Sequence, residues 1–184
     1  MRKNGYTLIE VLVALTIFTV VIAAPTGFFV SALKGQQKVL ASQEVYDNIS
    51  YTLEYISRAL RMARKDLTGS CITENMNYVT TADGNGIKFK NYDGDCQEFY
   101  LDIEDNRLKE TSDAKGVGIP LTARNIEVVS FTIEGEGTWS QDDGFQPKIT
   151  LLLEIKGKRG ALPELQPIMK IQTSVSQRQL DIGY

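Results

Sequence analysis

The feature that most constrains this chain is an apolar run close to its N-terminus. From Tyr6 to Leu33 the sequence contains one charged residue, Glu10, and residues 11–24 are almost wholly apolar. A helix of about 20 apolar residues, rising about 1.5 Å per residue, is long enough to cross a hydrocarbon core of about 30 Å. The run therefore predicts a membrane-spanning helix.

The charges around this run predict its orientation. Arg2 and Lys3 precede it, whereas Lys34 and Lys38 follow it at a distance. Positive residues next to a span favour retention of that end in the cytoplasm. We therefore expect a single-pass inner-membrane protein with a cytoplasmic N-terminus, whose remaining chain is exported to the periplasm or to a cell-surface filament.

A secretory signal peptide and a plain membrane anchor are alternative interpretations of the same run. The signal-peptide interpretation lacks a convincing small-x-small cleavage site. The candidate segment, residues 22–25, has Ile22 and Pro25 at positions where small residues are required. Neither alternative explains Glu10, since a charge at membrane depth costs about 2.5 kcal/mol or more. An acid at that position indicates a functional residue.

Residues 5–10, Gly-Tyr-Thr-Leu-Ile-Glu, and the apolar run after them resemble the class III signal of type IV prepilins and type II secretion pseudopilins. The resemblance implies a leader peptide at residues 1–5, cleavage between Gly5 and Tyr6 by a prepilin peptidase, and N-methylation of Tyr6. Glu10 matches the family's acid at the fifth mature position. There it would pair with the new cationic α-amine, on its own or a neighbouring helix, because burying a pair is cheaper than burying either charge alone.

Pro25 and Gly27 interrupt the apolar segment, which we place at residues 6–33 as the transmembrane and filament-core helix. Proline removes a helical hydrogen bond and clashes with the preceding turn. A kink or a locally melted stretch is therefore expected over residues 21–27, and a mild bend without a role is the alternative.

An amphipathic stripe follows, with apolar residues at spacings of three and four. Its members are Tyr46, Ile49, Leu53, Ile56, Leu60, Ala63 and Leu67. The stripe predicts an amphipathic helix half within residues 34–67, continuous with the first helix and ending near Lys65. Its apolar face is expected to rest on a sheet.

Residues 68–184 predict an extracytoplasmic, β-rich globular region. Strands are expected at 86–90, 97–103, 107–110, 126–134, 148–156 and 168–178, with a hairpin loop at 91–95. Alternating apolar residues in the last two strands suit a half-buried antiparallel sheet. Together with the resemblance, this predicts a pilin-like α+β fold: a long N-terminal helix packed on an antiparallel sheet. The loop at 135–144, with Trp139, is expected to be exposed.

Two cysteines, Cys71 and Cys96, lie 25 positions apart in the polar half of the chain. In an exported protein such a pair predicts a disulfide. Two free thiols are the alternative.

Composition argues against several functional classes. The net charge is −3, and no dense Lys/Arg cluster is present to bind nucleic acid. Histidine is absent, which removes the commonest general base and metal ligand. Asp93–Asp95 and Asp142–Gly144 lack the acidic spacing of a calcium loop, and Gly84–Gly86 is too short for a phosphate-binding loop. We therefore expect no enzyme activity, no metal and no cofactor.

The segment 171–178 resembles the C-terminal strand of J-type minor pseudopilins and W-type minor pilins. The resemblance implies a minor subunit that helps initiate or cap a type IV pilus or type II secretion pseudopilus. Its partners would be other pilins or pseudopilins through the N-terminal helix, the prepilin peptidase and the inner-membrane assembly platform. The alternatives are a prepilin-anchored adhesin, a component of a DNA-uptake (competence) pilus, and a membrane-anchored enzyme.

Overall fold

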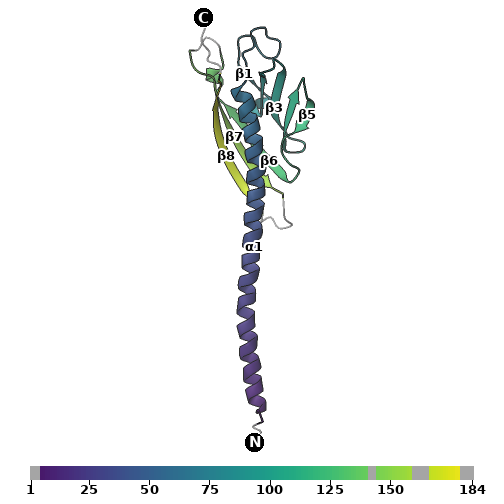
Figure 1. Ribbon diagram of the computed structural model, residues 1–184, viewed down its shortest axis with the longest axis vertical. Helices are drawn as coiled ribbons and strands as arrows, with labels where there is room; N and C mark the ends of the chain where they lie inside the picture. Colours follow the sequence, from purple (N-terminus) through teal and green to yellow (C-terminus); the bar gives the residue numbers. More distant parts are fainter. Residues whose placement is uncertain (1–4, 141–143, 159–165, 179–184) are drawn as a thin grey trace. The chain divides into compact units, whose positions relative to one another are not determined.

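The computed structural model describes residues 5–140, 144–158 and 166–178. The chain divides into two compact units, Met1–Leu40 and Ala41–Tyr184. The long helix α1, Leu8–Arg61, contributes to both (Figure 1). The predicted pilin-like α+β fold, a long N-terminal helix with an antiparallel β-rich region, is confirmed.

The N-terminal unit consists of the first part of α1, whose apolar side chains are exposed in the isolated chain. This part includes a stretch that is long and apolar enough to cross a membrane. The helix continues through Pro25 in the isolated chain, which has no locally melted stretch over residues 21–27; a kink there, or melting inside a filament, stays a prediction. The physical reason for the continuity is that one proline removes a single intrahelical hydrogen bond, while the bonds on either side of it still form.

The threonine hydroxyl groups of this apolar part donate hydrogen bonds to carbonyl oxygens of the same helix. Thr16 donates to the carbonyl oxygen of Val13 at 2.8 Å, and Thr19 donates to that of Leu15 at 2.7 Å. Thr26 makes the same kind of bond. In a lipid environment polar groups must find partners inside the protein, so these threonines are compatible with a membrane span.

In the globular unit, α1 buries one stripe, and the predicted stripe is correct at its centre and wrong at its ends. Ile49, Ile56 and Leu60 are fully buried, as predicted, whereas Tyr46 and Leu67 are both 60% exposed. Val45 is buried in place of Tyr46, because the buried positions follow the 3.6-residue helical period from there to Leu60.

The helix ends at Arg61, four residues before the predicted end near Lys65. The chain turns there because the next segment pairs with a strand. The N–H of Arg64 donates to the carbonyl oxygen of Lys90 at 2.8 Å. A long-range pairing therefore decides where the helix stops.

Two antiparallel sheets pack with this part of α1, where a single sheet was predicted (Figure 1). The first sheet follows chain order: β1 (Tyr78–Thr81), β2 (Gly86–Lys90), β3 (Cys96–Asp102), β4 (Arg107–Ser112) and β5 (Gly116–Pro120). A short 3₁₀ turn, η1 (Ala82–Gly84), joins β1 to β2. The predicted hairpin at 91–95 is confirmed, since Lys90 of β2 pairs with Cys96 of β3.

The second sheet contains β6 (Ile126–Glu134), β7 (Lys148–Gly157) and β8 (Ile168–Ser176), with the 3₁₀ turn η2 (Glu136–Thr138) after β6. The predicted strand at 126–134 is confirmed at both ends. The alternating apolar residues of β7 are buried, as predicted, at Ile149, Leu151, Leu153 and Ile155. Because β6 also contacts β2, β3 and β4, the two sheets share one hydrophobic core with α1.

Trp139 is buried in this core, so its predicted exposure is wrong. Its side chain is 1% exposed, and its indole N–H donates to the carbonyl oxygen of Lys148 at 3.0 Å. Its ring also packs edge-on against Tyr78. Gly135 allows this return of the loop: its φ is +127°, and a Cβ there would lie 2.1 Å from the Lys148 oxygen.

Candidate functional site

The residues predicted for processing and assembly lie in the first turn of α1 and directly before it. Gly5 and Tyr6 precede the helix and are exposed, Tyr6 by 88%. The N–H and the hydroxyl of Thr7 each donate to Oε2 of Glu10 at 2.9 Å. The N–H of Glu10 in turn lies 3.4 Å from Oγ1 of Thr7. These reciprocal contacts form a capping box.

Thr7 is a residue that the sequence interpretation missed, although the Thr-x-x-Glu spacing before an apolar run is a known helix-start signal. The capping box fixes the beginning of the helix at Leu8, so that Tyr6 and Thr7 separate it from the predicted cleavage point. The Gly5–Tyr6 peptide is therefore left outside the helix. Residues 1–4 of the predicted leader, with Arg2 and Lys3, lie outside the described residues.

The predicted disulfide between Cys71 and Cys96 is confirmed. It joins the loop after α1 to the first residue of β3, and its Cα atoms lie 5.4 Å apart, within the usual range. The bridge fixes this loop to the edge of the β2–β3 hairpin.

A buried carboxylate organises the same loop. Asp66 is fully buried, and its Oδ2 accepts hydrogen bonds from the N–H of Cys71 at 2.6 Å and of Ile72 at 3.1 Å. Its Oδ1 accepts from the N–H of Thr68 at 3.2 Å and from Nζ of Lys90 at 3.4 Å. Burial alone would raise the pKa of Asp66, but these hydrogen bonds outweigh it and hold the pKa well below its usual range.

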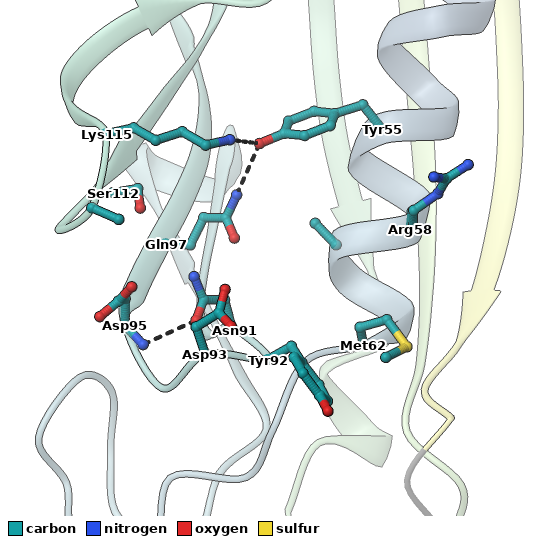
Figure 2. Close-up of a pocket in the computed structure, with 12 residues that line it drawn as sticks. Tyr55, Arg58, Met62, Asn91, Tyr92, Asp93, Asp95, Gln97, Ser112 and Lys115 are labelled. Atoms are coloured by element: carbon teal, nitrogen blue, oxygen red, sulfur yellow. Dashed lines mark hydrogen bonds between the residues drawn. The ribbon is translucent and has the colours of Figure 1, made fainter.

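A pocket of about 250 Å³ lies beside the last turns of α1 (Figure 2). The β2–β3 loop and the β4–β5 turn form its other walls. Its lining residues are Tyr55, Arg58, Ala59, Met62, Asn91, Tyr92, Asp93, Asp95, Gln97, Ser112, Ala114 and Lys115. The lining combines polar side chains with a larger exposed apolar surface.

A hydrogen-bonded network lies at the base of this pocket. Glu110, which is 2% exposed, accepts from the hydroxyl of Tyr55 at 2.9 Å, from Nε2 of Gln97 at 2.8 Å and from Nζ of Lys115 at 3.3 Å. Figure 2 shows the Lys115 and Gln97 side chains converging on the Tyr55 hydroxyl.

The network has the properties of a structural support. Burial raises the pKa of Tyr55, and the hydrogen bond to Tyr55 raises the pKa of Lys115, so both keep their protons at neutral pH. The carboxylate of Glu110 is satisfied by its partners. The arrangement holds the β3–β4 strands against α1 and presents no activated acid or base.

The acidic turns found in the sequence form no cation site in the described part of the chain. No group of three or more His, Cys, Asp or Glu side chains is close enough to hold a metal there. Asp93 and Asp95 lie in the β2–β3 turn, where the N–H of Asp95 donates to Oδ1 of Asn91 at 2.9 Å. Asp142 and Asp143 lie outside the described residues.

Residues 1–24 match the family model described as the prokaryotic N-terminal methylation motif. The matched range includes Gly5, Tyr6, Thr7 and Glu10 and most of the apolar run. No curated protein and no solved structure matches the chain. The motif and the fold together are similar to those of type IV pilins and pseudopilins.

This motif implies processing by a peptidase and, in general terms, partners in filament assembly. The apolar part of α1 fits anchoring in the inner membrane before incorporation into a filament.

Proposed function

We propose that this chain is a prepilin that is cut between Gly5 and Tyr6, is N-methylated at Tyr6 and then enters a filament as a subunit. The observation that carries the proposal is the exposed Gly5–Tyr6 peptide, which lies directly before a capped helix start and inside the range that matches the methylation motif. An exposed peptide outside regular secondary structure is the form in which a backbone is accessible to a peptidase.

The proposed organisation follows from that cleavage. Residues 1–5 are the leader, residues 6–33 the membrane and filament-core helix, residues 34–67 the amphipathic half, and residues 68–184 the exported globular region. The orientation keeps the basic N-terminus in the cytoplasm. The Cys71–Cys96 disulfide supports export, because such bridges persist in oxidising compartments.

Glu10 is proposed to direct subunit assembly. The Thr7–Glu10 hydrogen bonds hold the carboxylate one helical turn from Tyr6, the residue that gains a cationic α-amine on cleavage. That amine, in the same helix or in a neighbouring subunit, would pair with Glu10. A buried pair with this geometry favours one axial register, since a shifted helix leaves both charges unpaired.

A minor role, in initiating or capping a type IV pilus or a type II secretion pseudopilus, is the specific function that we infer. It is supported by the resemblance of residues 171–178 to minor-subunit strands and by the early position of both cysteines. The adhesin alternative loses its main support, because Trp139 is buried.

The assembly role is tested with Glu10→Ala in the source cells. We expect normal cleavage of the precursor and about a tenfold or greater loss from sheared filaments, because the α-amine then lacks its counter-ion. Asp47→Ala is the matched control, since Asp47 is an exposed acid in the globular half of α1. Equal incorporation of both variants would contradict the role of Glu10.

The minor role has its own measurement, the ratio of this subunit to the principal pilin in purified filaments by quantitative mass spectrometry. A minor initiator should be a small fraction of the subunits, and its deletion should lower the number of filaments. If it proves to be the most abundant subunit, the minor assignment is wrong while the prepilin assignment stands.

A further inference from the structure

Three arginines from separate parts of the chain meet at the end of α1. Arg61 is the last residue of the helix, Arg64 lies in the segment that follows it, and Arg178 lies just after β8. The N–H of Arg178 donates to the carbonyl oxygen of Arg61 at 2.8 Å, which fixes the end of β8 next to the end of α1. The cluster therefore exists only in the folded globular unit.

These arginines line a second pocket of about 390 Å³. Met62, Ala63 and Tyr92 complete its wall, and Met62 and Tyr92 also line the first pocket. The guanidinium carbon of Arg64 lies 4.5 Å from the centre of the Tyr92 ring. A guanidinium held by its face in this way keeps its N–H edges available for a further partner.

Stabilisation of the helix end is the simplest alternative explanation, since cations near a helix C-terminus are favourable. The terminal carbonyl groups, however, already have partners. The Leu60 oxygen accepts from the hydroxyl of Tyr78 at 2.7 Å, and the Arg61 oxygen accepts from the N–H of Arg178. No guanidinium of the cluster donates to these carbonyls in the described structure.

The three guanidinium groups also form no ion pair within the described residues. Elsewhere in the chain the arginines use their donors: Arg58 pairs with Glu54 at 3.1 Å, and Arg107 donates to the carbonyl oxygen of Thr122. Like charges that line one pocket repel one another unless a counter-ion is present, and here they do so in a chain whose net charge is −3.

Two acids of the adjoining pocket do not pair with the cluster in the described structure. Asp93 and Asp95 line that first pocket, and neither is within ion-pair distance of the three guanidinium groups. Glu110 at its base is occupied by Lys115 and Tyr55. Among the described residues, the lining of the second pocket contains no Asp or Glu that would compete with an entering anion.

We propose that this pocket is an oxyanion-binding site that takes a carboxylate or phosphate group of a small ligand. Planar guanidinium groups present paired N–H donors that match both kinds of oxyanion. The exposed ring of Tyr92 flanks the site and offers an apolar or planar surface to the rest of the ligand. The proposal does not depend on the prepilin assignment.

Met62 provides a reporter, because it lines the pocket and the chain has only four methionines. The full chain is labelled with methyl-¹³C methionine in a non-ionic maltoside detergent and titrated with inorganic phosphate and, separately, with tricarballylate, at constant ionic strength set with sodium chloride. We expect saturable shifts of the Met62 methyl signal, with a midpoint at millimolar concentration or below, and unchanged signals from Met76 and Met169.

The triple variant R61Q/R64Q/R178Q should bind at least about tenfold more weakly, while R124Q, which removes an exposed arginine outside the pocket, should bind as the native chain does. A response to phosphate alone or to tricarballylate alone supports the proposal and identifies the oxyanion. The proposal is wrong if neither anion shifts Met62, or if the triple variant keeps the native midpoint. Unchanged Met76 and Met169 signals in the variants confirm that they are folded.

Discussion

The two halves of α1 contain similar residues in opposite environments. Ile17, in the N-terminal half, is 59% exposed, whereas Ile56, in the globular half, is completely buried by the two sheets. An exposed apolar surface of this length marks a site that lipid or other proteins cover. The first half is therefore suited to a membrane or to other helices, and the second half to the chain's own sheets.

The threonines show the same difference. In the first half, Thr16 and Thr19 donate only to carbonyl oxygens of their own helix. In the second half, the hydroxyl of Thr52 lies 3.1 Å from the Asn48 oxygen and also 3.1 Å from the Leu121 oxygen, outside the helix. In lipid, the polar groups of the first half need partners within the helix itself. The second half instead also forms hydrogen bonds with the rest of the globular unit.

The largest expected effect tests this contrast directly with one substitution in each half. Ile56→Ala should destabilise the globular unit by about 3 kcal/mol, because it opens a cavity in the core. Ile17→Ala should leave that stability unchanged. Chemical unfolding followed by fluorescence of the buried Trp139 in non-ionic detergent measures both. Similar losses in the two variants would contradict the division of α1.

Loss of the disulfide is expected to have the next-largest effect on stability. Replacing both Cys71 and Cys96 by serine should cost the globular unit about 3 kcal/mol, because the bridge restricts a loop in the unfolded chain. The membrane fraction of the protein should not change, since the apolar half of α1 is independent of the bridge. Unfolding curves and membrane fractionation on the same variant separate the two units, and loss of membrane association would contradict this independence.

Asp66 should give a smaller effect that depends on pH. The pKa of Asp66 is lowered in the folded state, so its carboxylate stabilises the fold fully above the unfolded pKa of about 3.9. This stabilisation is lost progressively as the pH falls from that value towards the folded pKa. Asp66→Asn should cost roughly 2 kcal/mol at pH 7 and should flatten the loss of stability in acid. Asp47→Asn, at an exposed position, should behave as the native chain. Parallel acid profiles for native and Asp66→Asn chains would contradict this role.

Local patterns predicted much of the fold. The apolar run predicted the helix, alternation predicted β7 and β8, and Gly94 in a polar turn predicted the β2–β3 hairpin. The strands β1 and β5 were missed for different reasons. β5 contains Gly116, Gly118 and Pro120, which disfavour strands, and β1 has only four residues; both are held by pairing with neighbours.

The residues proposed for function and those that support the site differ in the same way in how far the sequence alone could identify them. Glu10 was predictable because an acid inside an apolar run is conspicuous, and Thr7 could have been found from its spacing to Glu10. The roles of Asp66, of Trp139 and of the arginine cluster depend on contacts between segments distant in the sequence. Such contacts have no local sequence signal.

The central claim concerns the N-terminus of the mature protein. Mass spectrometry of the chain purified from its source cells measures that end directly. The account predicts a mature chain that begins at Tyr6, lacks residues 1–5 and carries a methyl group on its α-amine. A chain that retains residues 1–5, or that begins after the apolar run, would contradict it.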